Sequence, residues 1–460
     1  MEFQVKHLVI IGAGFSGAVT AIEFLKRAPQ GSRLTIINRS GKMARGLAYG
    51  TNSPDHLLNV PAGNMSALVD EPNSFLNYFR QFEPDAHSGS FVSRKLYGTY
   101  LSELLDLAKE QSRVQCESVA GEVCSIEPQA DGTKALIVLQ AGEQIVADHV
   151  VLAFGNFPPA TPRGLQSLVD SRFYVEDPWA FKAEEIHCEA PQVLLIGSGL
   201  TAVDILISLL RSHPKASITM LSRRGLLPTD HREKLPAPGF TTNIGADLLA
   251  GSATVADYVR QVRREVARSP EYWREIVAAL RPVTSELWSR LNVVERQRFL
   301  RHVQPHWDVY RHRVAPQTFR IYQDALAASR IKTIAGRIVS ARVTGECVSM
   351  TIMPRGSDLN IDCSFDRVIN CTGPCTDIRK ISDPLISYLS KESMIQADEL
   401  GVGIAVAQDY SVVSGSGSNL QWLSYVGPML KARLWEATAV PELRQHARAL
   451  VAKIVERFGG

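Results

Sequence analysis

The stretch Leu8-Val9-Ile10-Ile11-Gly12-Ala13-Gly14-Phe15-Ser16-Gly17 decides how this chain begins to fold. Its first half predicts a buried strand, its second half reads Gly-x-Gly-x-x-Gly, and apolar residues at helical spacing follow. In this pattern Gly12 permits the tight turn, Gly14 lets the backbone approach a pyrophosphate, and Gly17 lets the helix pack against the strand. The helix N-terminus would add N–H groups and a positive dipole end. We therefore predict a dinucleotide site, with an ordinary strand–helix turn as the alternative.

The end of the next predicted strand, residues 34–38, departs from the usual pattern. About 20 residues past the glycines, an acidic residue commonly binds the ribose hydroxyls. Here Asn38 stands at that position. An amide can bond a hydroxyl, but without the strength of a charge-assisted hydrogen bond. We expect Asn38 to line the nucleotide site and to hold the ribose less tightly than a carboxylate would.

The opening pattern returns about 185 positions later in the chain. Residues 193–196 form a second apolar run, which leads into Gly197-Ser198-Gly199-Leu200-Thr201-Ala202. Alanine is permitted at the third glycine position of this fingerprint. Gly197 and Gly199 therefore predict a second dinucleotide site, and we expect an α/β chain with two Rossmann-like domains.

The strand after the second fingerprint ends in Ser222-Arg223-Arg224-Gly225, without an acidic residue. A guanidinium fork matches the geometry of a phosphate group. Arginine near this place typically accommodates the 2′-phosphate of NADP. Ser222, Arg223 and Arg224 therefore predict NADP(H) rather than NAD(H); two solvated surface arginines are the alternative.

Composition places the chain among globular proteins of two or three domains. Of its 460 residues, 45% are hydrophobic and 21% are charged. The formal net charge of +3 is small for this length and predicts no polyanion partner. No apolar run approaches the roughly 18 residues of a membrane span, and residues 1–7 lack a signal-peptide pattern. Seven scattered cysteines favour reduced thiols in a cytoplasmic protein, and their spacing suggests no metal site.

The segment between the two fingerprints predicts mixed structure. Residues 74–82 and 97–109 have the pattern of amphipathic helices, and residues 114–127 and 134–148 that of antiparallel strands. A buried strand then ends at Gly155, and a proline-rich linker follows.

Residues 253–313 are helical in pattern, rich in arginine and free of lysine, with three tryptophans interleaved. A basic and aromatic segment can indicate nucleic-acid binding. No known nucleic-acid module is visible, and acidic residues balance part of the charge. We therefore expect an inserted helical subdomain with its tryptophans in its core.

Two fingerprints, each followed by a later strand ending in glycine, resemble the two-dinucleotide-domain flavoproteins over nearly the whole chain. The resemblance implies that residues 1–165 are the first part of an FAD-binding domain. Residues 185–335 would be an NADP(H)-binding domain with the helical insertion at about 253–313, and residues 336–460 would return to the FAD domain. Turns at Gly155, Gly373 and Gly427 are further places where we expect backbone to face a cofactor.

The run from Arg45 to Phe79 narrows this resemblance. Its Gly-x-Ala-Tyr-Gly and Leu-Leu-Asn-Val-Pro patterns look like bacterial FAD/NAD(P)-binding proteins, some of which resemble N-hydroxylating flavin monooxygenases. Flavin-containing monooxygenases also carry an Asn-x-Pro with a methionine six residues beyond the asparagine, a spacing that Asn59 and Met65 share. The resemblance implies that Arg45, Asn59 and Met65 lie at the flavin and that Asn59 helps to hold an oxygenated intermediate. A loop asparagine bonded to its own backbone is the alternative.

The implied activity is that of an FAD-dependent NADPH oxidoreductase, a monooxygenase acting through a C4a-hydroperoxyflavin. Its expected substrate is a nucleophilic heteroatom, with N-hydroxylation of an amino acid or small amine favoured. An NADPH dehydrogenase or oxidase without oxygen insertion remains an alternative, as does a non-catalytic nucleotide sensor. A disulfide reductase using Cys371 and Cys375 is a further alternative, although these cysteines lack the usual Cys-x-x-Cys spacing.

A substrate carboxylate would need a cation. The candidates are Arg94, Lys95, Arg311 and Arg313, and each has an alternative interpretation as a surface residue or a nucleotide-phosphate ligand. His312 is open to three interpretations: a packed histidine, a pyrophosphate ligand or a substrate contact. We expect a small-molecule substrate and O₂ as partners, no nucleic acid and no membrane. A homo-oligomer is left open.

Overall fold

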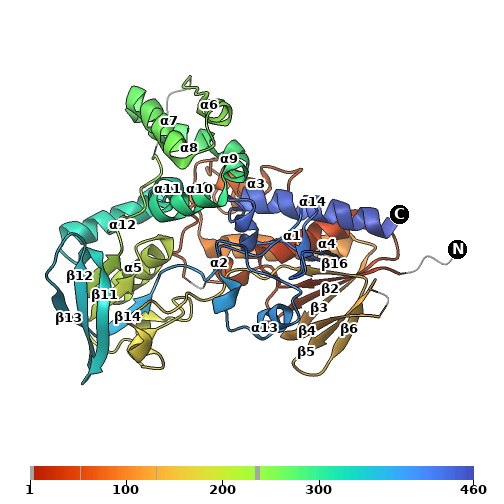
Figure 1. Ribbon diagram of the computed structural model, residues 1–460, viewed down its shortest axis with the longest axis horizontal. Helices are drawn as coiled ribbons and strands as arrows, with labels where there is room; N and C mark the ends of the chain where they lie inside the picture. The colour runs from red at the N-terminus through yellow and green to blue at the C-terminus, as the bar shows by residue number, and fades with distance from the viewer. Residues whose placement is uncertain (1–4, 52, 131, 234–238, 460) are drawn as a thin grey trace.

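The chain forms two Rossmann-like units, each built on its own twisted sheet, with a lobe of helices above them (Figure 1). The computed structural model describes residues 5–51, 53–130, 132–233 and 239–459. The predicted α/β class with two dinucleotide-type domains is confirmed. Within the described residues, no helix is long and apolar enough to cross a membrane.

The first unit contains a six-stranded sheet in the order β15-β16-β7-β1-β2-β3. The central strand β1 is completely buried, because a parallel strand that is covered on both faces needs apolar side chains on both sides. Helix α1 (Phe15–Arg27) packs over it together with α4 (Arg94–Gln111) and α14 (Val440–Gly459). The strands are β1 (His7–Ile11), β2 (Arg33–Asn38), β3 (Gln115–Ala120), β7 (His149–Leu152), β15 (Ser411–Val413) and β16 (Asn419–Tyr425).

The second unit repeats this plan in a seven-stranded sheet of order β13-β12-β11-β10-β9-β14-β8. Strand β9 lies between β10 and β14 in parallel pairing, as β1 lies between β2 and β7. Helix α5 (Leu200–Ser212) follows β9, and α12 (Pro316–Ala327) precedes β11. The strands are β8 (Tyr174–Val175), β9 (Gln192–Ile196), β10 (Ser217–Ser222), β11 (Ile331–Thr344), β12 (Cys347–Pro354), β13 (Ile361–Phe365) and β14 (Arg367–Asn370).

This pairing corrects the expected domain limits of 185–335 and 336–460. Strands β11 to β13 continue the second sheet as an antiparallel extension, and β14 pairs directly with β9. The chain therefore returns to the first unit only after Asn370, while β8 already belongs to the second sheet. Gly373 follows β14 and so lies beside the second fingerprint.

The helical insertion begins earlier than residue 253, at α6, and forms the lobe at the top of Figure 1. Of the three expected core tryptophans, only Trp288 is buried, at 3% exposure, whereas Trp273 and Trp307 are half-buried around a cavity. The elements of the insertion are α6 (Ile244–Ala250), α7 (Val255–Arg268), η4 (Pro270–Tyr272), α8 (Trp273–Ala279), η5 (Arg281–Val283), α9 (Thr284–Arg290), α10 (Val293–Arg298), the π-helix η6 (Phe299–Val303) and α11 (Gln304–Arg311).

Other local expectations hold with changed limits. The amphipathic helices are α3 (Ser74–Phe79) and α4. The segment 114–127 divides, because β3 joins the first sheet in parallel with β2 while β4 (Val123–Pro128) turns away. Strand β4 forms a separate antiparallel sheet with β5 (Ala135–Leu139) and β6 (Gln144–Ala147). Trp435 and Glu436 precede α14, the last helix of the chain.

Candidate functional site

The first fingerprint forms the turn that its glycines predict. Gly12 adopts φ +102°, and its N–H donates to the Ile37 carbonyl over 2.8 Å, which joins the turn to β2. A Cβ at Gly12 would lie 2.7 Å from the Ala153 carbonyl oxygen, and one at Gly17 would lie 1.8 Å from the Gly12 carbonyl oxygen. Both positions therefore require glycine for close packing.

Gly14 differs from these two because the structure leaves room beside it. The nearest atom to a Cβ there would be the Cα of Gly46, at 3.6 Å. Gly14 is the N-cap of α1, no side chain caps this helix end, and its first turn carries no acidic residue. Such uncapped N–H groups form a ready-made site for an anion.

A cavity of about 360 Å³ opens at this turn. Residues from β1, the α1 N-terminus, β2 and the loop after β7 form its wall, including Gly12, Gly14, Asn38, Arg45 and Gly155. A Cβ at Gly155 would meet nothing within 4 Å, so the backbone there is open toward a ligand. The bare glycine backbone and the uncapped helix end fit the diphosphate of a dinucleotide.

Asn38 lies in this cavity, but its side chain is committed to the local loop. Its Oδ1 accepts from the Ala13 N–H at 3.5 Å, and its Nδ2 donates to Ser40 Oγ at 2.9 Å and to the Lys42 carbonyl at 2.7 Å. The asparagine therefore shapes the wall of the cavity, and a ribose contact would have to compete with these bonds.

The segment around Arg45 closes over the fingerprint. Ala44 adopts φ +66°, and a Cβ at Gly46 would lie 2.8 Å from the Gly14 Cα. The short helix α2 (Gly46–Tyr49) begins here and packs against α4, where a Cβ at Gly98 would meet the Tyr49 carbonyl oxygen at 2.3 Å. The irregular stretch is thus an ordered wall of the cavity.

The remaining residues expected at the flavin lie outside the lining of this cavity. Met65 is buried at 2% exposure in the core of the first unit. Gly427 adopts φ +156° against the Tyr425 hydroxyl, directly before Pro428, which does line the cavity. Asn59 is half-buried and lies at the contact between the two units.

The second fingerprint has the same turn. Gly197 adopts φ +110°, its N–H donates to the Leu221 carbonyl over 2.8 Å, and a Cβ there would lie 2.3 Å from the Cys371 carbonyl oxygen. Cβ atoms at Gly199 and Gly373 would meet nothing within 4 Å. Helix α5 again has an uncapped N-terminus without an acidic first turn. This turn is therefore open to a second anion.

The strand end after this turn carries the two arginines. Ser222 Oγ accepts from the Gly225 N–H at 3.0 Å and bonds Ser198 Oγ at 2.9 Å, which shapes the loop. Arg223 is exposed. Arg224 donates to the Arg301 carbonyl at 2.9 Å and to His306 Nε2 at 3.1 Å. Neither arginine has a carboxylate partner within the described part of the chain.

A positively charged cluster lies where the units meet. His231 of the second unit donates from Nε2 to the Asn59 carbonyl at 3.0 Å, since a carbonyl can only accept. Burial and the nearby charge of Arg313 lower the pKa of His231 to about 4, so it is neutral at pH 7. The Asn59 side chain itself makes no hydrogen bond to another described residue.

Arg313 is the cation in this cluster that lacks an ion-pair partner among the described residues. Burial and the charges of Arg274 and Arg311 lower the pKa of Arg313 to about 10, and its buried Nε has no hydrogen-bond acceptor. Its guanidinium lies 5.9 Å from the ring centre of Trp273. A buried cation in this state gains most from an anionic ligand.

The other substrate candidates are committed or remote. Arg94 pairs with Asp204 at 3.0 Å and donates to the Leu57 carbonyl, so it connects α4 to α5 across the two units. Arg311 pairs with buried Glu436 at 2.8 Å. Burial lowers the pKa of His312 to about 3, and Lys95 is exposed on α4. Of the predicted cations, the structure places Arg313 best for a ligand.

The cysteines contradict a thiolate site. Cys371 is buried behind the second turn, and burial raises the pKa of its thiol well above the ordinary range. Burial also raises the pKa of Cys375, and neither forms a disulfide. A low thiol pKa is what makes a cysteine reactive, so this pair does not have the environment of a redox pair.

Fold and sites together define a protein with two dinucleotide-binding units. Residues 9–157, which form the N-terminal part of the first unit, match the family model described as FAD-NAD(P)-binding. A comparison with curated protein sequences finds no match.

Solved structures resemble the whole chain. An ornithine hydroxylase from Pseudomonas aeruginosa is 17% identical, with a TM-score of 0.66 over 98% of this chain and 99% of the other. An ornithine N-hydroxylase from Kutzneria sp. 744, whose structure holds reduced FAD, NADP⁺ and L-ornithine, is 14% identical, with a TM-score of 0.67 over 99% and 100%. A bacillithiol disulfide reductase from Staphylococcus aureus is 13% identical, with a TM-score of 0.56 over 99% of both chains. At these identities the likeness establishes the fold.

Sequence reasoning missed His231, Arg274 and Asp204. Their sequence neighbourhoods carry no motif, and each gains its place through contacts from distant segments. Only Asp204 could have been suspected from the sequence. It lies on the helix that follows the second fingerprint, and in the structure this helix contacts the first unit through the Arg94–Asp204 ion pair.

Proposed function

We propose that this protein is an FAD-dependent, NADPH-using monooxygenase that hydroxylates the nitrogen of an amino acid or small amine. The observation that carries the proposal is the arrangement of two open glycine turns in one chain. Beside the second turn lie Arg223 and Arg224, which have no carboxylate partner among the described residues. The likeness to N-hydroxylating enzymes supports it. We also propose that the protein acts in the cytoplasm, since its seven cysteines are free.

The chain's residues would bind and orient the two nucleotides. The cavity at Gly12 and Gly14 would hold FAD by its diphosphate, and the turn at Gly197 and Gly199 would hold NADPH, with Arg223 and Arg224 at its 2′-phosphate. Bound flavin supplies hydride acceptance and oxygen activation. No proton-transfer triad is required of the protein.

The cluster between the units would receive the substrate. The Asn59 amide makes no hydrogen bond to a described residue there, and neutral His231 holds the backbone of Asn59 in place. Arg313 would bind a carboxylate, because it has no ion-pair partner among the residues that the structure describes. Arg94 and Asp204 connect the two units nearby, which would keep the distance between the nucleotides fixed.

The test separates oxygen insertion from flavin reduction. Asn59→Ala should bind FAD and be reduced by NADPH as before, but it should release hydrogen peroxide in place of hydroxylated product. A preorganised donor in a dry site is typically worth about 2.7–4 kcal/mol, so product formation should fall by about two to three orders of magnitude. The measurement is NADPH oxidation, peroxide and hydroxylamine product with a panel of amines and amino acids.

Asn64→Ala is the matched control, since Asn64 is an exposed asparagine of the same loop. It should leave coupling unchanged. Wild-type protein that oxidises NADPH and yields only peroxide with every amine would replace the proposal with an oxidase or dehydrogenase. Reduction of a disulfide substrate by NADPH would favour the reductase, the second function that a structural neighbour suggests.

A further inference from the structure

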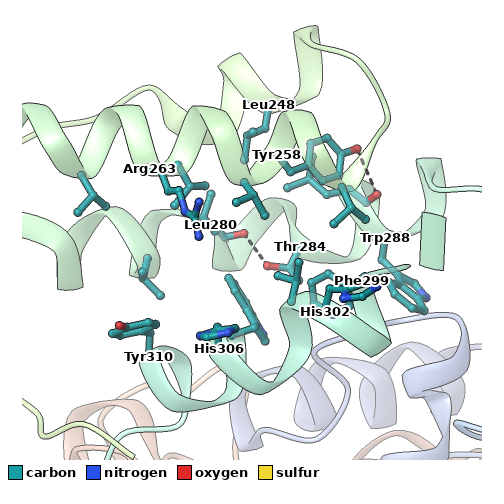
Figure 2. Close-up of a pocket in the computed structure, with 18 of the residues that line it drawn as sticks. Leu248, Tyr258, Arg263, Leu280, Thr284, Trp288, Phe299, His302, His306 and Tyr310 are labelled. Atoms are coloured by element: carbon teal, nitrogen blue, oxygen red, sulfur yellow. Dashed lines mark hydrogen bonds between the residues drawn. The ribbon is translucent and has the colours of Figure 1, made fainter. Parts of the chain in front are cut away.

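The helical insertion encloses a second, larger cavity, apart from the one at the first fingerprint (Figure 2). Its volume is about 840 Å³, within the roughly 300–1,000 Å³ typical of small-molecule pockets. Helices α7, α8, α9 and α11 supply most of the wall, and Trp435 closes one side. Four of the chain's six tryptophans line it, so an apolar ligand would be surrounded by aromatic surface.

The wall holds one permanent charge, the guanidinium of Arg263, and two histidines; burial and the charge of Arg224 lower the pKa of His306. Arg263, His302 and His306 line the cavity, and none of its described lining residues is an aspartate or glutamate. Figure 2 shows these three side chains around the space. An ammonium group inside it would find no counter-ion, whereas a carboxylate would find Arg263. The wall therefore selects against a diamine and in favour of an anion.

A buried donor in the wall lacks an acceptor. The indole N–H of Trp307 is buried and has no hydrogen-bond partner among the described residues. A buried polar group without a partner is costly, but this N–H is closed to solvent, so a ligand in the cavity would reach it only if the indole ring moved. The neighbouring hydroxyls of Thr284 and Tyr258 are already bonded to the carbonyls of Leu280 and Leu287.

We propose that the insertion binds an amphipathic organic anion, with an apolar body against the tryptophans and a carboxylate directed to Arg263. The ligand class is a medium-chain fatty acid or an aryl carboxylate. This site is separate from the cluster at Arg313 and does not rest on the proposed monooxygenase activity. The half-buried ring of Trp273 belongs to both places, since it lines the cavity and lies against Arg274 and Arg313.

The experiment measures binding to the oxidised holoprotein without NADPH. Dodecanoate should quench the intrinsic tryptophan fluorescence in a saturable manner and displace anilinonaphthalene sulfonate. Dodecylamine, with the same chain and the opposite charge, should bind at least about tenfold more weakly. Arg263→Glu should raise the dissociation constant of dodecanoate by about ten- to a hundredfold, which is the effect of losing one charged hydrogen bond. Val262→Trp, which fills the cavity, should abolish binding.

Arg264→Glu is the control, because this neighbouring arginine is exposed on the same helix and does not line the cavity. It should change the dissociation constant less than twofold. The proposal fails if dodecanoate does not bind, if dodecylamine binds as tightly, or if Arg264→Glu weakens binding as much as Arg263→Glu. It also fails if saturating NADPH abolishes dodecanoate binding, since His306 contacts Arg224 and the rim would then belong to the nucleotide site.

Discussion

The two glycine turns of this chain share a backbone and differ in the residues that surround it. Gly12 and Gly197 have φ values of +102° and +110°, and each donates over 2.8 Å to the strand beside it. The strands that follow end in Asn38-Arg39 and Ser222-Arg223. Arg39 pairs with Glu122 and Asp383, whereas Arg223 and Arg224 have no carboxylate within the described residues. An arginine after this fingerprint is therefore available to phosphate only where distant segments bring no acid to it.

Gly17→Ala should have the largest effect, because the new methyl would lie 1.8 Å from the Gly12 carbonyl oxygen. Overpacking commonly costs about 1–3 kcal/mol, and a clash with backbone should reach the upper end of this range. Urea unfolding and the flavin absorbance should both report the loss. The second unit already holds Ala202 at this position, so Ala202→Gly should cost only about 1 kcal/mol. Equal effects of the two substitutions would show that the turns are packed alike.

Gly14→Ala should leave the fold intact and remove FAD. The nearest atom to its Cβ is 3.6 Å away, so the methyl fits the protein but blocks the approach of a diphosphate. Each charged hydrogen bond lost is worth about 1.5–3 kcal/mol. Gly199→Ala is the counterpart in the second unit. It should weaken the binding of NADPH and leave the binding of FAD unchanged. Equilibrium dialysis of each nucleotide checks the pair, and full flavin occupancy in Gly14→Ala would contradict the assignment.

Replacing both Arg223 and Arg224 by alanine should raise the KM for NADPH about ten- to a hundredfold and leave the KM for NADH unchanged. The reason is the loss of charged hydrogen bonds to the 2′-phosphate, each worth about 1.5–3 kcal/mol. Steady-state kinetics with both nucleotides is the measurement. Arg342→Ala is the control, because Arg342 is exposed on β11 of the same unit and has no ion-pair partner among the described residues. It should affect neither KM. An unchanged KM for NADPH in the double variant would identify the two arginines as surface residues.

His149 should make the first unit sensitive to acid from within its sheet, at a strand position where the second sheet has no histidine. Burial in β7 lowers its pKa from 6.5 to about 3, so the folded protein keeps it neutral where the unfolded chain binds a proton. Its contribution to the free energy of unfolding is present above pH 6.5 and is lost toward pH 3, by about 1.4 kcal/mol per pH unit. The corresponding strand position in the second unit holds Arg367.

His149→Gln should flatten this pH dependence, measured as the difference from the wild type in urea unfolding at pH 7, 6 and 5. Glutamine can retain a hydrogen bond to Ser424, which His149 contacts at 3.1 Å. A variant whose stability follows the wild-type pH curve in parallel would show that other groups carry the acid sensitivity.

Much of the fold was predictable because it follows from local pattern. The apolar strands, the glycines and the helices after them imply two Rossmann-like units, and the structure confirms them. The domain limits were wrong because the sequence pattern of the strands at 331–370 is the same for either sheet, and so it does not show which sheet they join. Only pairing with β9 and β10 assigns them to the second unit. The roles of the predicted site residues, Asn59 among them, stay predictions.

The sequence by itself determined where backbone must come close to a ligand, because only glycine can supply those turns and its spacing is visible in one dimension. The tertiary structure decided which charges remain free. Arg94, Arg311 and Arg39 are neutralised by Asp204, Glu436 and Asp383, each more than a hundred residues away, while Arg313 is left without a described partner. Whether a cation is available to a ligand depends on whether a carboxylate lies within about 4 Å of it, and the fold decides which carboxylates come that close.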